Sequence, residues 1–245
     1  MNYIGDPDYQ TEHWEPQTAN DTCAVVAQST ILSQFGVDIS EEQAAYIATE
    51  NGWYSPGFGT SQEDLGNILE ACGVSVHHVH DASIFDLATE MQKGHRILVG
   101  LNSDELWDQG PQGEFWNWFI EKLGLDKAEF EPADHAVCVT GIDTTDPKNP
   151  CVILNDPGHP AGAGARYPLE RFMDAWENSG FHYVATDVAP GESATPSFDI
   201  GDFLGLGTTL AVAAFTGDVL AASEAGHFVD ELCDQVDWDS ILRAV

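Results

Sequence analysis

Four residue types that together carry out acyl transfer on a thiol occur along this chain in an informative order. Gln17 stands six residues before Cys23, His135 begins the apolar run HAVCVTGI, and Asp156 follows the apolar run CVILN. In cysteine-nucleophile sites a thiolate attacks a carbonyl, an imidazole moves the proton, and a polar side chain orients the imidazole. The sequence therefore predicts such a site at Gln17, Cys23, His135 and Asp156.

The surroundings of Cys23 favour a reactive thiol. The segment NDTCAVVAQSTILSQF predicts a helix over residues 20–35, capped within residues 20–22 and ended by Gly36. Cys23 would then lie in the first turn, where unpaired N–H groups and the helix dipole stabilise a thiolate. With the backbone N–H of Cys23, the side-chain amide of Gln17 would hold the oxyanion of a tetrahedral intermediate.

The imidazole and its partner are expected at strand ends. His135 would take the thiol proton and return it to the leaving amine, and the strand that follows it would fix its position. Asp156 would accept the second imidazole N–H, but Asn155 is a competing candidate for that role. Strand alternation places Asn155 and Asp156 on opposite faces, so only one of them should point at His135.

The remaining patterns predict an α+β fold, with a helical layer followed by a mostly antiparallel sheet. SEEQ at 40–43 is a capping box for a second helix, and SQED at 61–64 offers a similar start for a third. About five strands are expected, and helices are expected between some of them. The strand runs are 74–79, 96–101, 135–142, 151–155 and 181–188, and the further helices are 83–92, 168–176 and a segment within 103–133.

The charge of the chain limits its partners. Its 245 residues include 41 Asp plus Glu and only 8 Lys plus Arg, a formal net charge of -33. A field of that sign repels phosphate groups, so binding to nucleic acid or to anionic lipid is not expected. Peptide or protein partners that are cationic or neutral are favoured over anionic ones, but adaptation of the surface for solubility in a salty milieu explains the charge more simply than recruitment of a partner.

Cysteine usage and the amino-terminal segment bear on location and cofactors. The five cysteines, Cys23, Cys72, Cys138, Cys151 and Cys233, contain no C-x-x-C pair, so neither a zinc site nor a redox dithiol is indicated. No basic segment followed by an apolar stretch begins the chain, which leaves no secretory signal and favours a cytoplasmic location. No cofactor and no metal are expected.

The last part of the chain differs in composition from the rest. Residues 189–199 predict a linker rich in Pro, Gly, Ser and Ala, between a domain at 1–188 and a helical C-terminal extension at 200–245. The uncharged run at 203–216 is shorter than the ~20 residues that a membrane-spanning helix needs, so a packed helix is favoured.

Several motifs together resemble those of the papain-like cysteine peptidases, and most closely the bacterial branch that includes the double-glycine leader peptidases. They are Gln17-x5-Cys23, GT-S-x-x-DL at 59–65, DHAVCVTGID at 134–143, NDPG at 155–158 and YPLERFMDAWENSGFHYVAT at 167–186. The resemblance covers residues 10–188. It implies a nucleophile at Cys23, a base at His135, an orienting Asp156, an oxyanion-hole Gln17, and substrates with small residues such as Gly-Gly at the cut.

Other functions and sites are compatible with parts of the sequence. The same site with an amine acceptor would be an acyltransferase or transamidase, and a chain without catalysis would be an acidic binding module on a peptidase scaffold. HHVH at 77–80 and DTTDPKN at 143–149 could offer metal ligands, but an edge strand and a turn explain them more simply. Trp107, Trp116, Trp118 and Phe119 are expected to pack in the core rather than to line a groove.

Overall fold

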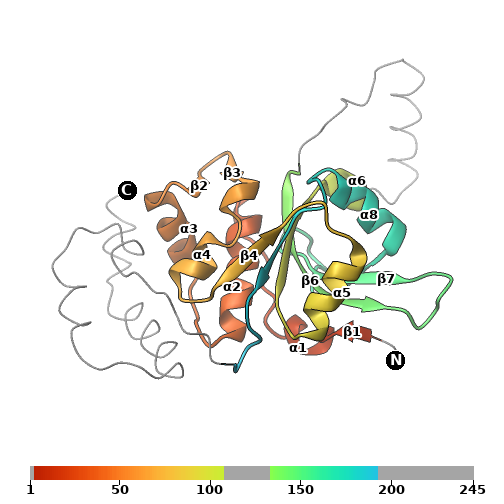
Figure 1. Cartoon of the computed structure of the whole chain (residues 1–245). Coiled ribbons are helices and arrows are strands. Elements are labelled where there is room, and N and C mark those ends of the chain that lie inside the picture. The colour runs from red at the N-terminus through yellow and green to blue at the C-terminus, as the bar shows by residue number, and fades with distance from the viewer. Residues whose placement is uncertain (1–2, 108–132, 193–245) are drawn as a thin grey trace, which may run out of the picture.

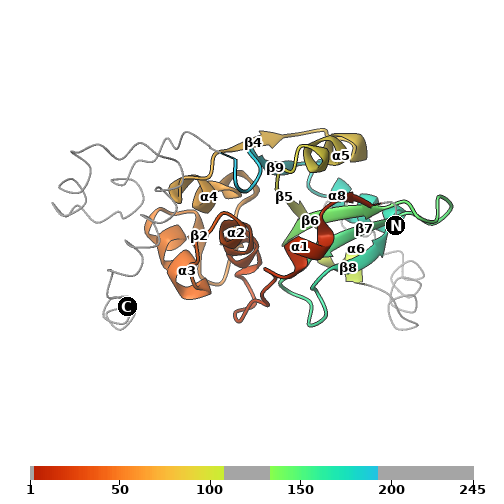
Figure 2. The same cartoon turned by 90° about the horizontal axis from the view of Figure 1, so that it is seen from below.

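The computed structural model describes residues 3–107 and 133–192, and every structural statement below concerns these two ranges. A seven-stranded sheet runs through them, with helices on both of its faces (Figure 1). Helices α2, α3 and α4 lie on one side of the sheet, and α5, α6 and α8 on the other; Figure 2 shows the two groups from below. The predicted α+β class is therefore confirmed.

All strand pairs of the large sheet are antiparallel. The strand order is β4-β9-β5-β6-β7-β8, with β1 paired to the far end of β6 beside a bulge at Val139/Gly141. A separate hairpin is formed by β2 and β3. The strands are β1 Tyr3–Gly5, β2 Tyr54–Ser55, β3 Gly59–Thr60, β4 Val76–Val79, β5 Ile97–Leu101, β6 His135–Asp143, β7 Cys151–Asn155, β8 Ala165–Pro168 and β9 Tyr183–Thr186.

The helices cover both faces because alternate residues of each central strand point to opposite sides. Ala136 and Cys138 of β6 join the core cluster of α2, α3 and α4, whereas Val137 and Val139 join the cluster of α5, α6 and α8. The helices are α1 Pro7–Thr11, α2 Cys23–Gln34, α3 Glu41–Glu50, η1 Gln62–Asp64, α4 Asn67–Ala71, α5 Ile84–Gln92, α6 Ser103–Trp107 and α8 Leu169–Glu177.

Helix α2 is buried on nearly all sides, which is why its sequence is apolar throughout. Val25, Ile31 and Leu32 are fully buried, and the helix packs on α3, α4 and β6. Its buried polar groups bond within the layer, since Gln28 Nε2 donates to the Ala24 carbonyl while Gln28 Oε1 accepts from the Ile68 N–H. Helix α2 is thereby tied to α4.

Local signals predicted some elements well and missed others. The capping box at Ser40 forms as expected and begins α3. The third helix begins later than SQED indicates, because Gly66 takes φ +93° and a Cβ there would lie 2.9 Å from side chains of Val76 and Val184. The expectation of about five strands was too low: β1 is very short, and β8 begins inside a glycine-rich segment that reads as a loop.

Some predictions fall outside the described residues. These are the helix within the 103–133 segment beyond Trp107, most of the linker, the C-terminal extension at 200–245, and Cys233. Among the residues that the structure describes, no helix combines the length and apolarity needed to cross a bilayer.

Candidate active site

Cys23 is the first residue of α2, as the sequence predicts, and its side chain is partly exposed. Thr22 precedes it, but its side chain makes no capping hydrogen bond to the helix; its hydroxyl donates to the Glu41 carboxylate. The first turn therefore keeps N–H groups that no Thr22 oxygen occupies. Such groups favour negative charge near a helix start.

His135 bridges Cys23 and Asp156. Its Nε2 donates to Asp156 Oδ1 at 2.7 Å, which leaves Nδ1 for the thiol of Cys23. The ring is 7% exposed. Burial opposes its charged form, but hydrogen bonds with Asp156 and Cys23, and the charges of both, outweigh burial and raise the pKa of His135 to about 9.

Asp156 is fully buried, and each of its oxygens has a donor. Oδ1 accepts from His135 and from the Gly158 N–H at 2.9 Å, and Oδ2 accepts from Trp107 Nε1 at 2.8 Å. Burial alone would raise the pKa of Asp156, but hydrogen bonds led by that from His135 lower it. The carboxylate is therefore held ionised beside the imidazole.

Asn155 faces away from His135. Its Nδ2 donates to the Gln10 carbonyl at 2.7 Å, and its Oδ1 accepts from the Gly164 N–H at 3.1 Å. Asn155 thus ties α1 to the segment before β8. Of the two candidates that strand alternation left open, Asp156 is the one whose side chain contacts the imidazole.

Gln17 lies in the segment between α1 and α2, next to the loop that follows Asp156. Its backbone N–H donates to the Pro157 carbonyl at 2.9 Å, and its Nε2 donates to the Ala19 carbonyl at 2.7 Å. Its Oε1 is buried without a hydrogen-bond partner, and lies 3.3 Å from where a Cβ on Gly158 would stand. The side-chain amide is therefore close to the loop that follows Asp156, and one of its two N–H bonds is fixed by Ala19.

The family is decided by a match over most of the chain. Residues 8–184 match the sequence model of the Peptidase C39-like family, a stretch that includes all four predicted site residues. The chain belongs to the C39-like peptidase family. The match confirms the papain-like cysteine peptidase resemblance.

Curated proteins and solved structures are also similar to this chain. Proteins described as uncharacterized, from Mycobacterium bovis and two Mycobacterium tuberculosis strains, are each 29% identical over 201 residues, which cover 71% of this chain and 80% of theirs. A crystal structure provisionally described as a C39-like peptidase from Bacillus anthracis superposes with a TM-score of 0.54 at 14% identity, covering 76% of this chain and 98% of that one. The fold of this C39-like chain is therefore papain-like.

A further structure is that of the peptidase domain of Streptococcus ComA, described as a bifunctional ABC transporter involved in quorum sensing. It is 17% identical to this C39-like chain, and the superposition covers 72% of this chain and 97% of the ComA domain, with a TM-score of 0.45.

Two site residues of the C39-like chain were missed by the sequence analysis. Trp107, grouped there with core aromatics, bonds to Asp156 and places its ring centroid 4.9 Å from that of His135 while remaining 36% exposed. Gly158 passes so close that a Cβ there would lie 2.7 Å from His135 Cε1. The NDPG motif contains Gly158 and could have identified it as a site residue. No sequence pattern around Trp107 indicates that its indole contacts Asp156.

The two candidate metal sites do not form in the described residues, where no group of three His, Cys, Asp or Glu side chains could hold a metal ion. His78 lies on the edge strand β4, and its Nδ1 is 3.0 Å from His182 Nε2. In the 143–149 segment the carboxylates of Asp143 and Asp146 accept backbone N–H groups, as turns require. Of the other described cysteines, Cys72 and Cys138 are buried and Cys151 is partly exposed.

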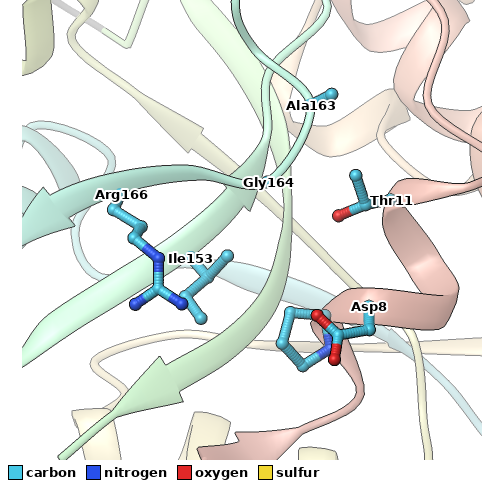
Figure 3. A pocket seen from close by; sticks show the side chains of 7 residues that line it. Asp8, Thr11, Ile153, Ala163, Gly164 and Arg166 are labelled. Atoms are coloured by element: carbon cyan, nitrogen blue, oxygen red, sulfur yellow. The ribbon is translucent and has the colours of Figure 1, made fainter.

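A cavity of about 290 Å³ lies apart from these catalytic candidates, between α1 and the strands β7 and β8 (Figure 3). Asp8 and Arg166 contribute to its lining, but Arg166 already bonds to Asp143 and to the Tyr3 hydroxyl. Gly164 also lines the cavity, and its N–H donates to Asn155 Oδ1 rather than to Asp156.

Proposed function

We propose that this chain is a cysteine peptidase that hydrolyses a peptide amide through an acyl-thioester on Cys23. The observation that carries the proposal is the single imidazole of His135 with a thiol on one side and a buried carboxylate on the other. That arrangement makes and stabilises a thiolate–imidazolium pair.

Each group of the site has a defined task in the proposed reaction. The Cys23 sulfur attacks the substrate carbonyl carbon while the proton of the thiol resides on His135 Nδ1, and the oxyanion is held by the Cys23 N–H and by Gln17 Nε2. The C–N bond then breaks as His135 gives its proton to the leaving amine. Water, deprotonated by His135, attacks the thioester and releases the acid, which restores the thiol. Asp156 keeps the imidazole oriented throughout.

The nature of the substrate is part of the same proposal. Cleavage after small residues such as Gly-Gly is supported by the motif resemblance, and a cationic or neutral peptide is supported by the formal net charge of -33. A panel of peptide p-nitroanilides ending in Gly-Gly, Ala-Ala or Leu-Leu tests the first point. Equal turnover of all three would contradict a preference for small residues.

Replacement of Cys23 is the decisive test. We expect Cys23→Ala to abolish amide hydrolysis, with a loss of about a millionfold or down to background, and we expect iodoacetamide to label Cys23 before any other thiol. Cys151→Ala is the matched control, since that thiol is also partly exposed but bonds only weakly to the Asn149 carbonyl. Hydrolysis that survives in Cys23→Ala would refute the proposal.

Product analysis separates the rival functions. Mass spectrometry of a reaction that contains peptide and an added amine such as glycine methyl ester would show an amide product if the acyl-enzyme prefers amines to water. Absence of both turnover and selective labelling of Cys23 would instead favour a binding module.

A further inference from the structure

A carboxylate from another helix holds the segment that joins Gln17 to Cys23. Glu41 is the first residue of α3, and its Oε2 accepts the Thr18 N–H at 2.9 Å while its Oε1 accepts the Ala19 N–H at 3.2 Å. The hydroxyl of Thr22 donates to the same Oε1. Three donors from residues 18–22, here called the pre-nucleophile loop, therefore converge on one side chain.

The same loop carries the contact that orients Gln17. The Ala19 carbonyl accepts a hydrogen bond from Gln17 Nε2 at 2.7 Å. One residue, Ala19, is thus bound by Glu41 through its N–H and binds Gln17 through its carbonyl. Because a primary amide has two N–H bonds, the one that goes to Ala19 directs the other and leaves it available to an oxyanion.

Glu41 is itself anchored independently of the loop. Its helix begins with a capping box in which Ser40 and Gln43 bond reciprocally, and α3 packs on α2. Burial alone would raise the pKa of Glu41, but hydrogen bonds from Thr22, Thr18 and Ala19 lower it, so the carboxylate stays charged. A fixed anion can therefore impose its geometry on the loop.

We propose that Glu41 is a positioning residue, which sets the Gln17 amide as an oxyanion donor by holding the pre-nucleophile loop. This inference rests on the proposed function. Glu41 does not touch the reacting atoms; it acts through Ala19 on Gln17. Its neighbour Glu42 carries the same charge in the same helical turn but is exposed.

The test compares Glu41→Gln with the matched control Glu42→Gln. On a Gly-Gly p-nitroanilide, Glu41→Gln should lower kcat by about tenfold to a hundredfold with little change in KM, because an oxyanion interaction is strongest in the transition state. Alkylation of Cys23 by iodoacetamide forms no oxyanion, so its rate should change less than twofold. Glu42→Gln should match the wild type in both assays. Equal losses in hydrolysis and alkylation would indicate a merely structural role and overturn the proposal.

A double-mutant cycle tests the route through Gln17. If Glu41 acts by positioning that amide, Gln17→Ala should lower kcat by about a hundredfold or more, and adding Glu41→Gln should lower it little further. Independent effects that multiply would overturn the proposed route. Thermal unfolding of each variant identifies any that fails to fold, and Glu41→Asp, which keeps the charge, then replaces Glu41→Gln.

A spectroscopic measurement keeps this inference distinct from the proposed function. If the wild type and Cys23→Ala are equally inactive on every substrate, the proposed function fails, but the side-chain amide of Gln17 can still be followed by NMR. We expect the N–H resonance of the bond to Ala19 to be protected from exchange with water in the wild type and in Glu42→Gln, and to exchange at least several-fold faster in Glu41→Gln. Unchanged resonances would overturn the positioning role.

Discussion

Two buried histidines at strand starts behave in opposite ways. His135 begins β6 and His182 directly precedes β9, and because Leu101 pairs with His135 while Val99 pairs with Tyr183, both lie toward the same end of β5. Both are buried, at 7% and 0% exposure. The pKa of His135 is nevertheless raised to about 9, whereas burial lowers that of His182 to about 4.

The difference lies in the partners. His135 has the Asp156 carboxylate on Nε2, but His182 has His78 on its Nε2, the ring of His80 stacked on it at 4.5 Å, and no partner on its buried Nδ1. Burial disfavours the imidazolium at both places, and at His135 the hydrogen bonds and negative charges of Asp156 and Cys23 reverse that effect. Burial of an imidazole therefore does not mark a proton-transfer group; the ionised partner does.

Removing the charge of Asp156 should have the largest effect, since it makes His135 resemble His182. Asp156→Asn has one acceptor oxygen for the three donors of His135, Gly158 and Trp107, so one or more is left unsatisfied. We expect kcat/KM to fall about a thousandfold or more. The imidazolium exists below the pKa of His135, so the alkaline limb should move from about pH 9 to lower pH.

A second substitution sharpens that result. Trp107→Phe removes the donor that meets Oδ2, so the double variant with Asp156→Asn should recover several-fold in kcat/KM over Asp156→Asn alone. The measurement is a pH–rate profile of Asp156→Asn, of Trp107→Phe and of the double variant. Activity of Asp156→Asn within threefold of the wild type would break the comparison between the two histidines.

Displacing the His135 ring should have an intermediate effect. In Gly158→Ala the new Cβ would stand 2.7 Å from His135 Cε1, so the ring or the loop must shift while the Asp156 charge is kept. We expect kcat/KM to fall by about tenfold to a hundredfold, the scale of a misplacement near 1 Å. Ala161→Ser, in the same loop but exposed, is the control and should retain wild-type turnover.

Changing His182 should have the smallest effect, and on stability rather than turnover. A group whose pKa is lowered on folding stabilises the fold above its unfolded value near 6.5, and that contribution is lost as pH falls from 6.5 toward 4. In His182→Phe the drop in Tm between pH 7 and pH 5 should be smaller than in the wild type by about 5 °C.

The control for His182→Phe is His13→Phe, from the segment after α1, where the imidazole bonds to Ser33. Differential scanning calorimetry at several pH values measures each Tm, and turnover at pH 7 should stay near wild type in both variants. An equal acid sensitivity of wild type and His182→Phe would show that His182 titrates normally.

Local sequence predicted the elements whose signals are local. The capping box at Ser40 appears where expected because its hydrogen bonds join residues three apart. The helix start at Cys23 and the strand that begins at His135 also appear where the local pattern of apolar residues predicts them. The late start of α4 was not predictable in the same way. Helix α4 begins only after Gly66, where the backbone passes close to the side chains of Val76 and Val184. Val76 is ten residues further along the chain and Val184 more than a hundred, so no local pattern indicates the contact.

By itself the sequence determined the residue types of the candidate site, their order, and the helix and strand ends that carry them, since these follow from periodicity and capping. Only the tertiary structure decided that Asp156 rather than Asn155 meets His135, that Trp107 closes over the carboxylate, and that Glu41 holds the loop before Cys23. The physical reason is that each choice depends on which hydrogen-bond partners arrive from other elements. Those partners are brought together only when α2 and α3 pack on one face of the sheet and α6 on the other.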